Sequence, residues 1–336
     1  MRMEPIDPVL GGQAVIEGVM MKGPDLFAVA VRKANGEIRI KDFPIITGRT
    51  KRALSKVFLL RGVVIMAAML VIGYRALQYS ADEAIEDAEA AVPSKKSSRD
   101  AATPATHGSE RKDNAAPRDE GKRGAGGFAM AGALALALIL GIVLFFWLPL
   151  LATRGMAELL PALSGRIAFN LVDGALRVVA FVGYILAIST MKDIRRIFQY
   201  HGAEHKVVNA YERKADLAPE AVKAHSCLHP RCGTSFLLFV MVISIVVFSM
   251  IPHDSSLAVK AGMRILLLPA IAGISYEALR LSARKAESPL FRALISPGLL
   301  LQRLTTREPE LSQIEVAIAS FRRVVPGGNR EAGLVE

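Results

Sequence analysis

Residues 127–152 read GFAMAGALALALILGIVLFFWLPLLA and lie in the longest uncharged stretch of the chain, between Arg123 and Arg154. At a rise of about 1.5 Å per residue, a helix of this length crosses a hydrocarbon core of about 30 Å. The stretch therefore predicts a transmembrane helix, and it places the chain among membrane proteins.

The composition of the whole chain agrees with this prediction. The chain has 336 residues, of which 52% are hydrophobic but only 6% aromatic, so Leu, Ile, Val and Ala dominate, as they do in lipid-facing helices. This excludes disorder of the whole chain, and two cysteines exclude a disulfide-stapled secreted domain. In a membrane protein, a net charge of +11 indicates cytoplasmic loops and contact with anionic lipid. We therefore expect membrane lipid, and no nucleic acid, as a partner.

Three further apolar stretches, residues 167–191, 234–251 and 261–279, extend the prediction to four spans. Lys and Arg counts alternate along the chain: eight in 82–123, two in 153–166, eight in 192–233, one in 252–260 and nine from residue 280 onward. By the positive-inside rule, both termini are then cytoplasmic. The N-terminus has no apolar segment typical of a signal peptide. We expect a multi-pass protein of the inner (plasma) membrane.

The segment before the first span divides into three parts. Residues 55–80 contain a short apolar run, which predicts a helix at the membrane interface or packed against the bundle. A fifth span is the alternative, although it would leave the ten Lys and Arg of residues 1–56 outside. Residues 81–126 are rich in Ala, Ser, Pro, Gly and charges, which predicts a disordered linker.

The cytoplasmic segment 1–54 is expected to contain a small β element. Residues 26–43 alternate in polarity around Asn35-Gly36, which predicts a β-hairpin with a type I′ turn. The glycine-rich stretch before it is interpreted as turns leading into the hairpin. The alternative interpretation places Gln13, Glu17 or Lys22 at an active site.

The membrane domain, residues 127–336, is expected to end in a cytoplasmic amphipathic helix. Ser312 and Glu315 have the spacing of a capping box that opens this helix. Upstream of it, Ser296-Pro297-Gly298 interrupts an apolar stretch, which predicts a broken or re-entrant element. The fold class is therefore a mainly α, polytopic helical membrane protein with about four transmembrane helices and a small N-terminal β-hairpin.

The loop 192–233 contains most of the residues that could bind a metal ion or take part in catalysis. Four of the six histidines and both cysteines lie within it. His201, Glu204 and His205 match the pattern H-x-x-E-H of inverted zincins. On a helix, residues four apart project from one face, so both imidazoles can bind one metal ion. Glu204 then lies beside the site, where a general base is needed. The alternative role for Glu204 is to orient an imidazole.

The second half of the loop offers the remaining ligands. We expect His229 and Cys232 to bind the metal, with His225 and then Cys227 in reserve, and zinc is the expected ion. Four protein ligands would make a structural site, whereas three ligands and a water molecule would make a catalytic one. The sequence leaves the number of ligands open.

Four stretches of the chain resemble the YqhQ-like family of bacterial membrane proteins. They are GGQAVIEGVMMKGP, FQYHGAEHKVVNAYE, HPRCGTSFL and PGLLLQRLTTREP followed by QIEVAI. The resemblance covers nearly the whole chain apart from the 82–126 linker. The family is a domain of unknown function whose members are often labelled predicted metal-dependent enzymes. That label implies roles for His201, Glu204, His205, His229 and Cys232 but no substrate, and the family has Cys or His at the position of His225.

Three functional hypotheses follow from the sequence. The first is a membrane-embedded, zinc-dependent hydrolase in which Glu204 accepts a proton, acting on a membrane protein or a lipid-derived molecule. The second is a membrane scaffold or regulator whose zinc only holds the loop 192–233 in place. The third is a transporter, suggested by Asp173 and Arg177 at membrane depth and by broken helices. The oligomeric state is left open.

Overall fold

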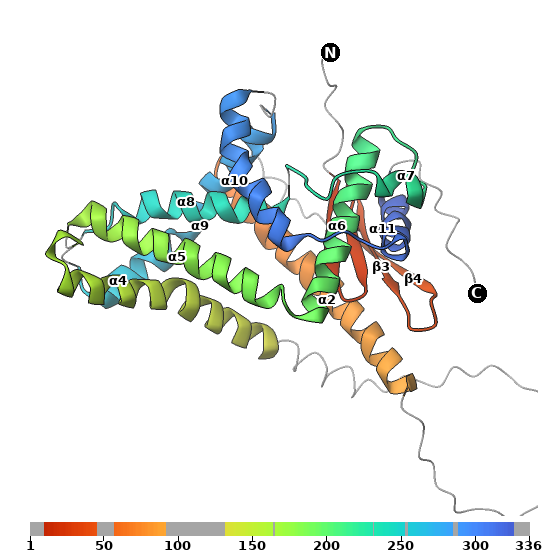
Figure 1. Ribbon diagram of the computed structural model, residues 1–336, viewed down its shortest axis with the longest axis horizontal. Helices are drawn as coiled ribbons and strands as arrows, with labels where there is room; N and C mark the ends of the chain where they lie inside the picture. The colour runs from red at the N-terminus through yellow and green to blue at the C-terminus, as the bar shows by residue number, and fades with distance from the viewer. Residues whose placement is uncertain are drawn as a thin grey trace, which may run out of the picture.

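The computed structural model describes residues 10–45, 57–91, 132–163, 165–230, 232–252, 255–284 and 288–325. A four-stranded sheet with its covering helices lies at one end of a bundle of long apolar helices (Figure 1). The site described below lies where these two parts meet.

The sheet is antiparallel with the strand order β1-β2-β3-β4. The strands are β1 (Gly11–Val15), β2 (Gly18–Lys22), β3 (Leu26–Arg32) and β4 (Ile38–Pro44). Alternate side chains of β2 and β3 enter two separate cores, so the sheet is the middle of three layers. One face packs on α6 (Lys192–Glu212) and α11 (Leu311–Val324), and the other face packs on α2 (Leu60–Ala91).

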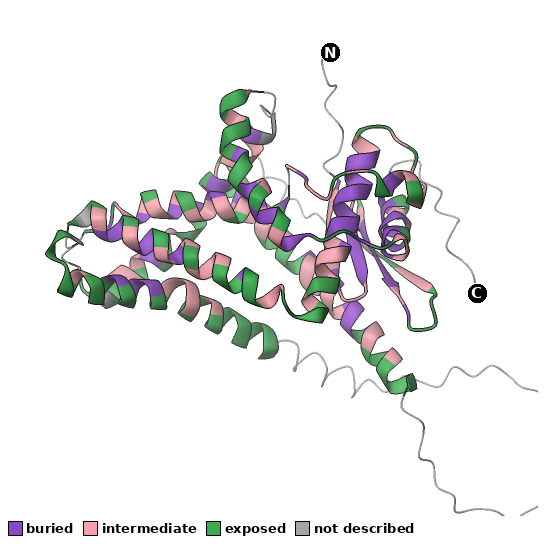
Figure 2. Cartoon of the chain, in the orientation of Figure 1, coloured by how far each residue is buried: buried purple, intermediate pink, exposed green. Residues whose placement is uncertain are grey.

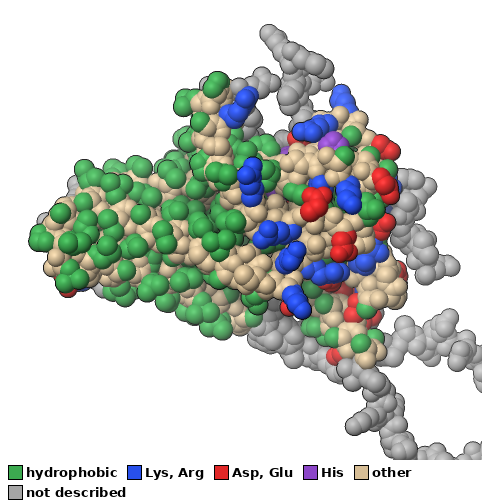
Figure 3. Space-filling view, in the orientation of Figure 1, with side chains coloured by type: hydrophobic (Ala, Val, Ile, Leu, Met, Phe, Trp, Pro, Cys, Tyr) green, Lys and Arg blue, Asp and Glu red, His purple; other side chains and the backbone are tan. Residues whose placement is uncertain are grey.

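The bundle contains a helical segment that runs from Gly132 to Leu159, through the π-helical turn η1 (Val143–Trp147) and α4 (Leu148–Leu159). A 3-10 turn, η2 (Pro161–Leu163), leads into α5 (Arg166–Ile188), and α8 (Gly233–Phe248) and α9 (Leu257–Arg284) complete the bundle. Large apolar side chains such as Leu138, Val179 and Leu266 are exposed on it. Figure 3 shows that hydrophobic side chains cover the bundle, while charged side chains gather around the sheet. In Figure 2 the buried residues concentrate in the sheet and its covering helices.

Four helices are long and apolar enough to cross a membrane: Leu60–Ala91, Gly132–Leu159, Ile167–Ile188 and Ala258–Ser282. The predicted fold class, a mainly α polytopic membrane protein with about four spans and a small N-terminal β element, is confirmed. The set of helices differs from the predicted one. The expected span 234–251 is the shorter helix α8 with 16 residues, and the segment predicted as an interfacial or packed helix belongs to the long helix α2.

Helix α2 makes contact with both parts of the molecule. Near its start Arg61 forms an ion pair with Glu277 of α9, whereas Ile72, Ala76 and Tyr79 pack on the sheet. The helix continues to Ala91, ten residues past the predicted start of the linker at residue 81, because Lys33 binds acidic side chains of its last turns. The rest of the predicted linker lies outside the described residues.

Four local predictions were wrong. The Asn35-Gly36 turn is a five-residue loop between β3 and β4 in which only Gly36 has a positive φ, so it is not type I′. The capping box of α11 is formed by Glu310 and Gln313 instead of Ser312 and Glu315. Pro297 lies inside the continuous helix α10 (Pro289–Thr305), which removes the predicted break there. The glycine-rich stretch, interpreted as turns, forms the paired strands β1 and β2.

Candidate metal centre

Helix α6 places His201 and His205 on one face. They are four residues apart, and their ring centroids are 4.4 Å apart. Between them, Gly202 allows the chain after α10 to lie against the helix, because a Cβ atom at this position would be 2.1 Å from the carbonyl oxygen of Arg307. That chain is fixed where the backbone N–H of Arg307 donates to the carbonyl of Phe198 at 2.9 Å.

Cys232 joins the two histidines from another element. It is the N-cap residue of α8, where its sulfur accepts a hydrogen bond from the backbone N–H of Thr234. The same sulfur lies 3.3 Å from Nε2 of His201. One ligand atom from each of His201, His205 and Cys232 lies within 4.8 Å of the other two. The structure thus brings together three predicted ligands from two helices.

The backbone orients both imidazoles toward a common centre. Nδ1 of His201 is 2.8 Å from the carbonyl oxygen of Thr305, and Nδ1 of His205 is 2.5 Å from that of Cys227. A carbonyl oxygen only accepts, so each Nδ1 carries a proton, and Nε2 is the ring nitrogen left to bind a metal. Histidines that bind metals are held in this way by a hydrogen bond from their other nitrogen.

Glu204 lies beside the three ligands and is 5% exposed. Its Oε1 accepts a hydrogen bond of 2.9 Å from the backbone N–H of Gly12, and its Oε2 is 3.6 Å from Nε2 of His205. Gly12 belongs to β1, an edge strand of the sheet. A Cβ atom there would be 3.2 Å from Cγ of Glu204, so the absence of a side chain gives this carboxylate its space.

His229 is buried near His201, His205 and Cys232 but lies outside the group that they form. Its ring centroid is 5.8 Å from that of His205, and its Nε2 lies 3.2 Å from Oε1 of Glu212. Burial lowers its pKa while the charge of Glu204 raises it, and the net shift is downward. The imidazole is therefore neutral near pH 7, as a metal ligand has to be.

The two reserve ligands also lie outside the group of three. Nδ1 of His225 has no hydrogen-bond partner among the described residues, and burial followed by the charges of Arg213 and Lys206 lowers the pKa of its ring. The thiol of Cys227 donates to Glu308, and burial raises its pKa to about 12. Cys227 is thus a neutral thiol, and it contributes its backbone carbonyl instead of its sulfur.

The loop between α7 (Pro219–Lys223) and α8 is held by side chains of two helices. From α6, Nζ of Lys206 and Nδ2 of Asn209 each donate to two backbone carbonyls of residues 223–228. From α10, the buried Gln302 pairs with both the N–H and the carbonyl of His229, at 2.9 and 2.8 Å. These bonds fix the path of the chain that delivers Cys232.

Gly12, Thr305 and Gln302 were not predicted from the sequence, whereas Gln13, Glu17 and Lys22 of the glycine-rich stretch were candidates. Gln13 donates to the carbonyl of Gly73, Glu17 pairs with Arg196, and Lys22 donates to the carbonyl of Gly23. None of these contacts reaches His201, His205 or Cys232. The glycine content of residues 11–23 was the only signal for a close backbone approach at Gly12.

Fold and site define an integral membrane protein in which a sheet-bearing domain covers one end of a helix bundle, with a cluster of metal-ligand side chains at the junction. The chain belongs to the family described as "Protein of unknown function (DUF1385)", which matches residues 57–326. It is similar to "Uncharacterized protein YqhQ" of Bacillus subtilis (strain 168), with 32% identity over 321 residues, 95% of this chain and 93% of that protein. The predicted resemblance to the YqhQ-like family is confirmed. No solved structure matches the chain.

Proposed function

We propose that the protein is a membrane-embedded, zinc-dependent hydrolase. The observation that carries the proposal is the group formed by His201, His205 and Cys232, with the buried carboxylate of Glu204 beside it. Each of these side chains is held by the backbone of a different part of the fold. The site is thereby preorganised for one task.

The chemistry of the ligand atoms fits zinc. Two imidazole nitrogens and one thiolate form a set that zinc binds in tetrahedral geometry, and Ca²⁺ and Mg²⁺ prefer oxygen ligands. With three protein ligands, one tetrahedral position is left for water or substrate, which is the arrangement of catalytic zinc sites.

Glu204 supports a catalytic role. A zinc ion held by the three ligands would lower the pKa of a water molecule toward 7. Oε2 of Glu204 lies 3.6 Å from Nε2 of His205, the nitrogen that would bind zinc, and it can accept a proton there. The Gly12 N–H holds Oε1 in place. A proton moved from water to Glu204 is then available for a leaving group.

The position of the site suggests a substrate from the membrane. Cys232 begins an apolar helix of the bundle, and Thr305 ends α10, whose side chains Leu290, Leu294 and Leu300 are exposed. A substrate that reaches the site along these surfaces has an apolar part. We propose a membrane protein or a lipid-derived molecule as the substrate.

A structural zinc site in a scaffold or regulator is the second candidate. It is favoured by His229, whose neutral ring lies 5.8 Å from that of His205 and could become a fourth ligand. In that case Glu204 only orients His205.

The experiment that separates the two candidates is Glu204→Gln. A glutamine keeps the shape of the side chain and the hydrogen bond to Gly12 but cannot accept a proton near pH 7. We expect full zinc content in the purified protein and loss of function in a complementation assay in cells that lack the protein. Glu220→Gln, at an exposed position of α7, is the matched control. Complementation by Glu204→Gln at the level of the control would favour the scaffold.

We also propose that both termini and the sheet-bearing domain lie on the cytoplasmic side of the plasma membrane. The strand β4 before α2 belongs to the sheet and the second half of α2 packs on it, so the chain enters and leaves this segment on the same side of the membrane and α2 does not cross. The bundle then crosses four times, with the loop between α8 and α9 outside. In intact cells, an impermeant maleimide should label Ser255→Cys and leave Glu220→Cys unlabelled. The reverse pattern would contradict this topology.

A further inference from the structure

The end of the bundle away from the sheet contains a cluster of buried charges. Oδ2 of Asp173 on α5 accepts hydrogen bonds from Nη2 of Arg177 at 2.9 Å and from Nη2 of Arg264 on α9 at 2.8 Å. The side chains of Asp173 and Arg264 are each 3% exposed. One carboxylate thus serves two arginines, and the cluster keeps a net positive charge.

Aromatic rings lie close to both guanidinium groups. Cζ of Arg177 lies 5.0 Å from the ring centroids of Phe146 and Phe248, and Cζ of Arg264 lies 5.2 Å from that of Phe248. Among the described residues, Nε of Arg177 and both Nε and Nη1 of Arg264 have no acceptor. Leaving such buried donors unpaired is costly.

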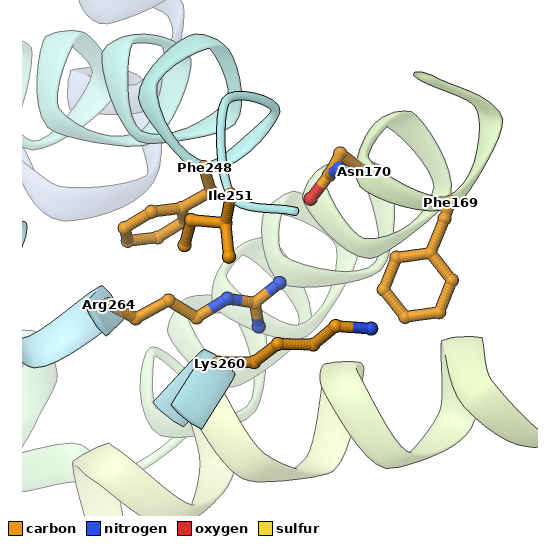
Figure 4. A pocket seen from close by; sticks show the side chains of 6 residues that line it. All are labelled: Phe169, Asn170, Phe248, Ile251, Lys260 and Arg264. Atoms are coloured by element: carbon orange, nitrogen blue, oxygen red, sulfur yellow. The ribbon is translucent and has the colours of Figure 1, made fainter. Parts of the chain in front are cut away.

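Arg264 lines a small pocket between α5, α8 and α9 (Figure 4). Lys260, one helical turn before Arg264, extends into the same space, with its Nζ 5.0 Å from the ring centroid of Phe169. Asn170 reaches the pocket from α5, and Ile251 and Phe248 close it from the end of α8. The pocket therefore combines two cationic groups and an amide with apolar walls.

We propose that this pocket binds a phosphate oxyanion, carried by an anionic phospholipid or free in solution. In the described part of the chain, Arg177 and Arg264 share the carboxylate of Asp173, and an anion would offset the cost of burying the excess positive charge of this cluster. The arginine edges offer the donors that phosphate oxygens accept. The pocket has room for about one oxygen atom, so one phosphate oxygen enters it while the rest of the ligand stays at its mouth.

The depth of the pocket agrees with a lipid phosphate. Lys260 and Arg264 follow the start of α9 at Leu257 by three and seven residues, which is about 5 and 10 Å along the helix. Asn170 is similarly close to the start of α5 at Arg166. The pocket thus lies near the headgroup region of the leaflet away from the sheet, and not at the centre of the bilayer.

The test is a titration of the full chain in neutral detergent micelles with dihexanoyl phosphatidylglycerol, dihexanoyl phosphatidylcholine or inorganic phosphate. The midpoint of thermal unfolding is measured at each concentration. Phosphatidylglycerol should raise the midpoint in a saturable way, and phosphatidylcholine should not. Arg264→Gln should weaken the apparent affinity by on the order of tenfold, as expected for a hydrogen bond to a charged group.

Two further variants make the test decisive. Lys260→Gln removes a half-buried cation at the pocket mouth, and it should weaken binding even if Arg264→Gln does not fold. Arg154→Gln changes an exposed arginine of α4 and should bind like the unmodified chain. Equal stabilisation by inorganic phosphate would support the site with free phosphate as its ligand. Equal stabilisation by phosphatidylcholine, absence of any stabilisation, or normal binding by Lys260→Gln would overturn the proposal.

Discussion

The substitution Gly202→Ala perturbs the metal centre without replacing any of the proposed ligand side chains. The added Cβ atom would lie 2.1 Å from the carbonyl oxygen of Arg307 and 3.3 Å from the sulfur of Cys227. A carbon and an oxygen atom normally stay more than about 3.3 Å apart, so the two backbones have to separate by about 1 Å. Thr305, which holds His201, is two residues before Arg307 and moves with it.

The magnitude has two parts with opposite signs. Overpacking of this kind costs about 1–3 kcal/mol of the free energy of unfolding, whereas alanine in place of glycine stabilises a helix by about 1 kcal/mol. The net loss of stability is then at most about 2 kcal/mol. Loss of the hydrogen bond that orients His201 should weaken zinc binding by about 10- to 100-fold.

Zinc affinity is measured by competition with a chelating dye in micelles, and stability by thermal unfolding. Gly183→Ala is the matched control, because it adds the same methyl group to a helix at a position with open space around the new Cβ atom. We expect the control to bind zinc like the unmodified chain. If Gly202→Ala also binds zinc with unchanged affinity, the hydrogen bond between the carbonyl of Thr305 and His201 does not orient this imidazole for zinc binding.

Three other changes test separate parts of the account. Gln302→Ala should reduce the free energy of unfolding by about 1–3 kcal/mol, because it leaves the buried N–H of His229 without a partner, while the carbonyl of His229 keeps only its bond from the N–H of Cys232. An unchanged thermal midpoint, equal to that of the exposed-site control Glu220→Gln, would contradict this. Lys33→Met should increase hydrogen exchange at the end of α2, where Glu83 and Asp87 lose their buried cation, and unaltered protection there would show that the ion pairs do not hold the helix. Removal of zinc by a chelator should lower the stability by about 3–4 kcal/mol when zinc was present at 100 to 1,000 times its dissociation constant, whereas an unchanged melting curve would argue against a bound ion.

The sequence predicted those parts of the site that depend on local geometry. His201 and His205 share a helix face because of their spacing alone, and Cys232 lies just before an apolar helix. The contact between Gly12 and Glu204 joins residues 192 positions apart, and only the packing of β1 against α6 creates it. The local sequence pattern of neither segment indicates that the two segments come into contact.

The same distinction explains the errors in the fold. The apolar run of residues 62–74 predicted a helix over 55–80, but α2 extends to Ala91 through acidic residues because Lys33 of a distant loop neutralises them. The stretch GGQAV has too many small residues to show the alternation of a strand, and it becomes one by pairing with β2. Helix α10 continues through Pro297, so a proline in an apolar stretch did not mark a break.

The central claim, a zinc ion held by His201, His205 and Cys232 with one position open, is tested most directly by X-ray absorption at the zinc edge of the purified protein. We predict one sulfur ligand at about 2.3 Å and three nitrogen or oxygen ligands at about 2.0–2.1 Å. The sulfur contribution should persist in Cys227→Ser and disappear in Cys232→Ser, and His229→Ala should leave the number of histidine ligands at two. Two sulfur ligands, or the loss of one histidine ligand in His229→Ala, would contradict an open catalytic site and would indicate a closed structural one.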